Sequence, residues 1–153
     1  MHEIRKISVI TVALNSQSTI KHTIESVNSQ DYSNIEYIVI DGASTDWTLD
    51  VLSHCNDKID FLISEEDDGI YDAMNKGIRV ASGDIIGILN SDDFYYDNNV
   101  LSRVAMAVPI EKIIVATSIH PSDDPLVAYL TKLGFTVFRG SLDEVVVRFQ
   151  QCL

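Results

Sequence analysis

Basic residues and cysteines are scarce in this chain of 153 residues. It has 11 lysines and arginines against 23 acidic residues, which gives a formal net charge of -12. This net charge argues against nucleic acid or an anionic membrane surface as a partner, because both are negatively charged. The two cysteines, Cys55 and Cys152, lack the spacing of a metal site, so we expect reduced thiols in a cytoplasmic protein.

Long apolar runs are missing as well. No run approaches the roughly 20 residues of a membrane-spanning helix, and residues 1–6 are too polar to begin a signal peptide. Hydrophobic residues still make up 46% of the chain. At this length we expect one globular domain over residues 1–153 with a buried core.

Strand-like and helix-like patterns alternate along the whole chain. Six short apolar strands are predicted, over residues 7–13, 37–40, 61–63, 85–89, 113–116 and 137–138. Helices are predicted between and after them, over about 18–29, 46–55, 70–81, 100–108, 123–133 and 141–149. This alternation favours an α/β fold with a mostly parallel sheet and helices on both of its faces.

Two of these helices carry apolar residues at helical spacing. In the helix over 46–55 we expect Leu49 and Leu52 to turn inward. In the helix over 70–81 the same pattern is formed by Ile70, Met74 and Ile78. The sequence thus predicts which side of each helix lies against the sheet.

Polar segments follow three of the predicted strands, at Asn15–Ser16, Asp41–Asp46 and Ser91–Asp93. We expect them to converge, because ligands of an open α/β sheet lie outside the carboxyl ends of its strands. The adjacent carboxylates Asp92 and Asp93 suit a hard divalent cation, which prefers oxygen ligands and can hold a diphosphate. Each segment also has a structural explanation, as an acidic turn in solvent or an ordinary turn between strand and helix.

Four longer segments extend these motifs: ISVITVALNSQSTIKHTIESVNSQDY, YIVIDGASTDWT, SEEDDGIYDAMNKGI and ASGDIIGILNSDDFYYD. With them, residues 5 to about 100 resemble the N-terminal, nucleotide-sugar-binding part of an inverting family-2 glycosyltransferase of the GT-A fold. The resemblance implies that Thr11, Ala13 and Asp41 hold the nucleobase. It also implies Asp92 near the ribose and Asp93 on Mn²⁺ or Mg²⁺, which would bridge the diphosphate.

The resemblance places one further segment, Asn75 and Lys76, beside the nucleotide. A solvated helical lysine is the alternative for Lys76. Two residues depart from the family pattern: Asp68 stands where a lysine is usual, and Trp47 where a small residue is usual. The candidate nucleotide-binding residues are Thr11, Ala13, Asn15, Asp41, Asn75, Lys76 and Asp92, with Asp93 as the metal ligand.

Residues from about 101 to 152 resemble a different family, the spore-coat-polysaccharide-type cytidylyltransferases. The similarity lies in VATS, the helix start DDPL and VFRGS. The Gly- and Arg-rich nucleotide loop of that family is absent, so Asp123, Asp124, Arg139 and Ser141 are expected to be caps and surface groups. Joining the two halves, 1–100 and 101–153, predicts a doubly wound, six-stranded Rossmann-like sheet of order 3-2-1-4-5-6.

Resemblances to parts of two different families in one chain suggest a chimeric or designed protein. The acceptor site and catalytic base of the glycosyltransferase family are not recognisable, so we expect residual metal-dependent binding of a nucleotide or nucleotide-sugar, UDP-type favoured, without turnover. The alternatives are a working glycosyltransferase that uses a nucleoside-diphosphate sugar, a cytidylyltransferase, and a scaffold without ligand. The third and sixth predicted strands lie at the edges of the predicted sheet and could pair between chains, so a homo-oligomer stays an alternative.

Overall fold

The computed structural model describes residues 4–107, 114–118, 121, 124–132 and 136–140. The chain divides into two compact units, Met1–Ala107 and Val108–Leu153. The predicted last helix, residues 141–149, lies outside the described residues, as does Cys152. Cys55 is a free, buried cysteine.

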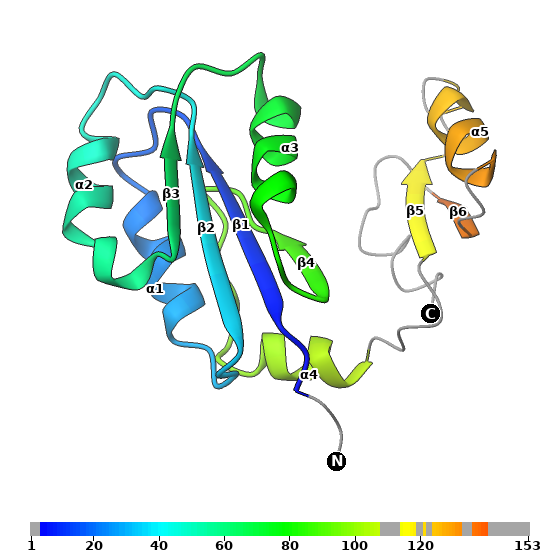
Figure 1. Cartoon of the computed structure of the whole chain (residues 1–153), viewed down its shortest axis with the longest axis horizontal. Coiled ribbons are helices and arrows are strands. Elements are labelled where there is room, and N and C mark those ends of the chain that lie inside the picture. The colour runs from blue at the N-terminus through cyan, green and yellow to red at the C-terminus, as the bar shows by residue number, and fades with distance from the viewer. Residues whose placement is uncertain (1–3, 108–113, 119–120, 122–123, 133–135, 141–153) are drawn as a thin grey trace. The chain divides into compact units, whose positions relative to one another are not determined.

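A four-stranded parallel sheet forms the centre of the first unit, in the order β3-β2-β1-β4 (Figure 1). Its strands are β1 (Ile7–Ala13), β2 (Ile35–Asp41), β3 (Phe61–Ser64) and β4 (Ile85–Ile88). The helices of the unit are α1 (Ile20–Asn28), α2 (Thr48–His54), α3 (Ile70–Val80), α4 (Val100–Ala107) and a 3₁₀ turn, η1 (Asn56–Lys58). The predicted elements are therefore found in their predicted order.

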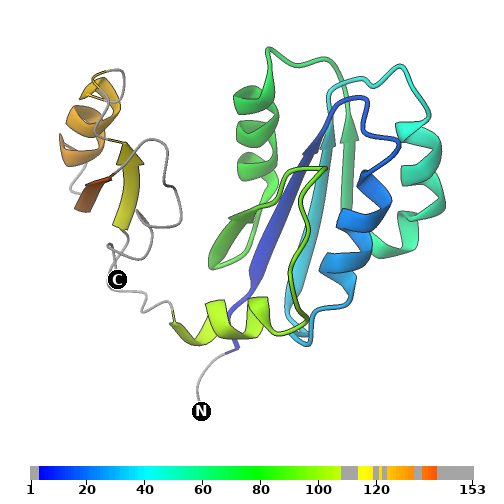
Figure 2. The same ribbon diagram turned by 180° about the vertical axis from the view of Figure 1, so that it is seen from behind.

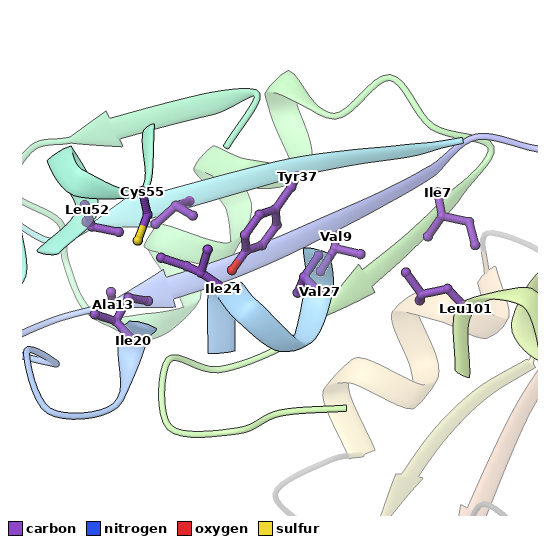
Figure 3. Packing of buried hydrophobic residues seen from close by; sticks show 11 residues of the cluster. Ile7, Val9, Ala13, Ile20, Ile24, Val27, Tyr37, Leu52, Cys55 and Leu101 are labelled. Carbon is purple, nitrogen blue, oxygen red and sulfur yellow. The ribbon is translucent and has the colours of Figure 1, made fainter. Parts of the chain in front are cut away.

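Strands β1 and β2 are buried because helices cover both faces of the sheet. Alternate residues of a strand point to opposite faces. On one face, Ile7, Val9 and Tyr37 pack against residues of α1, α2 and α4 (Figure 3). On the other, Ile10 and the residues beside it pack against α3. Apolar residues on both faces of a strand are typical of a parallel sheet.

Helix α3 lies close to the sheet because the residues at its contact are small. Ala73 and Gly77 are its buried residues, and a Cβ added to Gly77 would lie 2.5 Å from the Ile10 side chain. The predicted inward side is wrong for Ile70 and Ile78, which are 50% and 41% exposed. The large side chains of Ile70 and Ile78 lie beside the contact between α3 and the sheet, because only small side chains fit directly between the helix and the sheet. In α2, Leu52 is buried as predicted, whereas Leu49 is exposed.

The second unit contains β5 (Ile114–Ser118), α5 (Asp124–Lys132) and β6 (Thr136–Gly140). β5 and β6 are parallel and form a two-stranded sheet. Arg139 Nη2 lies 2.8 Å from Asp124 Oδ1, an ion pair between β6 and the start of α5. Asp123 and Ser141 lie outside the described residues.

The predicted fold class, α/β with a parallel sheet and helices on both faces, is confirmed. The order 3-2-1-4 and the pairing of strands five and six are confirmed as well. The first unit contains the four-stranded sheet, in which β4 pairs with β1, and the second unit contains the two-stranded sheet of β5 and β6. The continuous six-stranded order, which would join β4 to β5, stays a prediction. None of the helices in these residues has the length and apolar content to cross a bilayer.

Candidate functional site

A cavity of about 380 Å³ opens at the carboxyl end of β1. Its lining comes from three segments that are far apart in the sequence: the end of β1, the start of α3 and the turn after β4. The lining residues are Val12, Ala13, Leu14, Asp67, Gly69, Ile70, Ala73, Asn90, Ser91 and Asp92. The fold thus brings two of the predicted site residues, Ala13 and Asp92, to one cavity.

Glycines shape the wall of this cavity on the side of α3. Gly69 has a φ of 105°, a backbone conformation that favours glycine, and it precedes the first residue of α3. Its N–H donates to Asp67 Oδ1 at 2.8 Å. A Cβ on Gly42 would lie 2.5 Å from Asp67 Oδ2, so glycine at position 42 leaves room for that carboxylate.

The opposite wall is a turn over residues 90–93, which we call the aspartate turn. The N–H of Asp93 donates to the carbonyl of Asn90 at 3.0 Å, which closes the turn. Asp92 and Asp93 are exposed, and Asn90 Nδ2 donates weakly to Asp93 Oδ2 at 3.3 Å. Among the described residues, Asn90 Oδ1 is a buried side-chain oxygen without a hydrogen-bond partner. A water or an ion usually satisfies such an oxygen.

The charges around the cavity are negative. Asp67 and Asp92 line it, and no Lys, Arg or His among the described residues does so. A phosphate would therefore be repelled unless a cation lay between it and the carboxylates. No cluster of three or more His, Cys, Asp or Glu side chains in the described part of the chain could hold a metal alone. Two adjacent carboxylates plus the phosphates of a bound ligand are a usual oxygen set for Mg²⁺, so the residues present fit such an ion.

Asn15 connects the loops after β1 and β2 and does not line the cavity. Its φ is 51°. Its Oδ1 accepts from the N–H groups of Thr45 at 2.9 Å and Asp46 at 3.3 Å, while its own N–H donates to Ser44 Oγ at 2.8 Å. The side chain predicted to face a ligand thus holds two loops together at the edge of the sheet.

Thr11 and Asp41 are fully buried, and both bond to the protein itself. Thr11 Oγ1 lies 3.0 Å from the Tyr37 hydroxyl, and burial raises the pKa of that tyrosine. The Asp41 carboxylate accepts from the N–H and hydroxyl of Ser44 and from Ser64 Oγ at 2.7 Å. A carboxylate has about four acceptor positions, so at most one remains for a ligand.

Lys76 points to the loop before α3. Its Nζ donates to the carbonyl of Glu66 at 2.6 Å and lies 3.1 Å from Glu65 and 3.4 Å from Asp72. Partial burial lowers the pKa of Lys76, but the two carboxylates more than offset it and raise that pKa overall. Asn75 is exposed on α3. Neither residue lines the cavity.

Asp67 is the lining residue that the sequence prediction overlooked. We singled out its neighbour Asp68, which does not line the cavity. The signal was available: residues 65–68 are an acidic run directly after the third strand. A polar segment in that place belongs to the same edge of the sheet as the three segments that were selected.

An open parallel α/β sheet with a cavity at its carboxyl edge belongs to the class of α/β folds that bind their ligands outside the ends of the strands. Within this class, the chain belongs to glycosyl transferase family 2, whose family model matches residues 8–145. The predicted resemblance to family-2 glycosyltransferases is therefore confirmed. The match continues past residue 100, whereas the resemblance of residues 101–152 to cytidylyltransferases, and with it a chimeric origin, stays a prediction.

Two curated relatives show the extent of the similarity. The chain is 41% identical over 103 residues to an uncharacterized glycosyltransferase of Mycobacterium tuberculosis, covering 67% of this chain and 39% of that protein. It is 34% identical over 99 residues to the UDP-Glc:alpha-D-GlcNAc-diphosphoundecaprenol beta-1,3-glucosyltransferase WfaP of Escherichia coli, covering 64% and 39%. The chain thus spans about two fifths of the length of the curated relatives it matches.

Solved structures share the fold. The mannosyltransferase PcManGT from Pyrobaculum calidifontis, in complex with GDP-Man and Mn²⁺, matches with a TM-score of 0.65 and 24% identity over 80% of this chain and 38% of that one. Residues 1–349 of Staphylococcus aureus TarS, in complex with UDP-GlcNAc, match with a TM-score of 0.62 and 24% identity over 76% and 36%. Both likenesses establish the GT-A type of α/β fold.

Proposed function

We propose that this chain binds the nucleotide-sugar donor of a family-2 glycosyltransferase, which transfers the sugar to an acceptor. Membership of the family supports this alternative over a designed protein without turnover. The observation that carries the proposal is the acidic cavity beside the aspartate turn. Among the described residues, no Lys, Arg or His side chain lines this cavity. A nucleoside diphosphate suits such a site only together with a metal ion.

Asp92 and Asp93 are the residues proposed to meet the ribose and the divalent cation, Mn²⁺ or Mg²⁺. Both are exposed beside the cavity, and the buried, unpartnered Asn90 Oδ1 lies within the same turn. When bound, the ion would stabilise the leaving diphosphate as a Lewis acid. The chain's own part is to supply carboxylate oxygens at a fixed place and to keep the ion next to the cavity.

The nucleobase is proposed to lie toward the ends of β1 and β2. Ala13 lines the cavity, and the buried Asp41 has at most one acceptor position left for a base N–H beside its bonds to Ser44 and Ser64. Thr11 and Asn15 would act by holding the strand and loop in place, and Asn75 and Lys76 through the start of α3. Uridine is the first base to test, because WfaP is named for UDP-Glc and TarS is solved with UDP-GlcNAc.

Titration calorimetry with UDP, CDP and GDP tests the proposal, first with Mn²⁺ and then with EDTA. We expect heat of binding with Mn²⁺ that disappears with EDTA and in the Asp92→Ala/Asp93→Ala double variant. The Asp31→Ala/Asp57→Ala variant is a matched control, because it removes the same charge from exposed residues that do not line the cavity. A folded protein that gives no heat at millimolar nucleotide with Mn²⁺ would contradict donor binding.

A further inference from the structure

Helix α1 carries a buried polar stripe formed by Thr23, Ser26 and Gln30. Their exposures are 1%, 8% and 9%. The spacing of three and four residues places them on one side of the helix. Gln30 lies two residues beyond Asn28, the last residue of α1, and continues this side. Buried polar side chains destabilise a fold unless they find hydrogen-bond partners, so the partners of this stripe explain why it is there.

The stripe bonds to the main chain of the segment that carries the aspartates. Thr23 Oγ1 shares its one proton between the carbonyls of Ser91 at 2.9 Å and Asp93 at 2.8 Å, a three-centre hydrogen bond. The N–H of Tyr95 donates to Ser26 Oγ at 3.2 Å. Gln30 bonds the same segment further on, with Nε2 donating to the carbonyl of Asp97 at 2.7 Å and Oε1 accepting from the N–H of Leu101 at 3.0 Å. Figure 2 shows the segment running beside α1 from the end of β4 to α4.

Further contacts fix the same end of the segment. Ser16 Oγ lies 2.7 Å from Ser91 Oγ, and the rings of His22 and Phe94 stack with their centroids 4.4 Å apart. The carboxylates of Asp92 and Asp93 are exposed and receive little from the protein. Their place beside the cavity is therefore set by the main chain around them, and α1 holds that main chain.

We propose that α1 is the positioning element of the aspartate turn and that Thr23 is its principal positioning residue. The two carbonyls that Thr23 bonds are those of Ser91 and Asp93, the residues on either side of Asp92, so one hydroxyl holds the main chain of the turn before and after that aspartate. This inference rests on the proposed function. Groups that hold metal ligands in place typically contribute about 10- to 100-fold to metal affinity.

Thr23→Val tests the proposal, because valine keeps the shape of threonine and removes the hydroxyl. We expect Mn²⁺-dependent UDP affinity to fall about tenfold, and Thr23→Ser to restore it. Ile24→Val is the matched control: Ile24 is a fully buried neighbour on α1, and its loss of one methylene should lower the Tm without changing the affinity. An equal loss of affinity in Ile24→Val, or none in Thr23→Val, would overturn the proposal.

Hydrogen exchange of the ligand-free protein separates this inference from the proposed function. We expect the amides of Asp93 and Tyr95 to exchange faster in Thr23→Val than in the parent chain, and Tyr95 to do so in Ser26→Ala. Unchanged exchange in both variants overturns the positioning role even if UDP binds. If the parent chain binds no nucleotide, faster exchange still supports the positioning of the turn while the donor site fails. Ser26→Ala also serves as the test if Thr23→Val does not fold.

Discussion

Carboxylates at the two ends of the central sheet have opposite surroundings. At the amino end, Glu36 is buried and accepts from Lys6 Nζ at 2.6 Å, from the hydroxyls of Ser8 and Ser82, and from the Ser82 N–H at 2.8 Å. At the carboxyl end, Asp92 and Asp93 are exposed, and the aspartate turn gives them one weak bond from Asn90. The protein satisfies the carboxylate oxygens of Glu36 with hydrogen bonds. It leaves most of the carboxylate oxygens of Asp92 and Asp93 available to a ligand.

The difference separates a group that stabilises the fold from groups proposed to bind a ligand. Glu36 joins the residue before β1 to β2 and to the turn before β4, so it fastens three strands at their starts. Burial alone would raise the pKa of Glu36, but the bonds from Lys6, Ser8 and Ser82 outweigh it and lower the pKa to about 2. A metal ion needs the reverse, oxygens that the protein has not already satisfied.

The largest loss of stability is expected from a side chain added at the amino end of the central sheet. A Cβ on Gly83 would lie 2.6 Å from the N and Oγ of Ser8 and 2.8 Å from the carbonyl oxygen of Lys6. Because two of these atoms are main-chain atoms, the strands must move apart, and Gly83→Ala should cost about 3 kcal/mol of unfolding free energy. Urea denaturation measures this. Gly87→Ala is the matched control: its nearest atom is the Tyr95 hydroxyl at 3.8 Å. A loss of similar size in both variants would contradict the argument.

The next largest effect is a pH dependence of the unfolding free energy that is caused by Glu36. Its pKa is lowered from 4.5 to about 2 in the folded chain, so the unfolded chain binds the proton more tightly. The stability it contributes is complete above pH 4.5 and is lost as the pH falls toward 2. Between pH 7 and pH 3 the parent chain should lose about 2 kcal/mol more than Glu36→Gln does. The other carboxylates titrate in both proteins, so the difference between their unfolding free energies isolates the contribution of Glu36. Unfolding free energies that fall in parallel with pH would exclude the effect.

The sequence predicts the central strands well and the packing of α3 poorly. The apolar run of residues 7–13 matches β1 in both bounds, because a strand buried on two faces leaves a continuous signal. In α3, periodicity selected the largest side chains, whereas close packing selected Ala73 and Gly77. The pattern of apolar residues does not encode how near two elements approach.

The cavity lies at the edge of the sheet where the sequence predicts a site, but only some of the predicted residues line it. Asp92 and Ala13 line the cavity, because strand ends can be located from sequence. Asn15 and Lys76 lie at the same edge, yet their polar atoms are bonded to neighbouring loops. Whether a polar side chain meets a ligand or its own chain depends on long-range contacts, such as that between Asn15 and Thr45. Local sequence does not report these.

The smallest effect on stability is expected at the aspartate turn. Asp92 and Asp93 are exposed and lie in a chain of net charge -12, so removing both carboxylates loses one weak bond and relieves repulsion. We expect Asp92→Ala/Asp93→Ala to change the unfolding free energy by less than about 0.5 kcal/mol in the absence of metal. Adding Mn²⁺ together with UDP should then raise the Tm of the parent chain and leave that of the variant unchanged, because a ligand stabilises only the state that binds it. A metal-free variant destabilised as strongly as Gly83→Ala would make these aspartates structural, and the contrast between the two ends of the sheet would be lost.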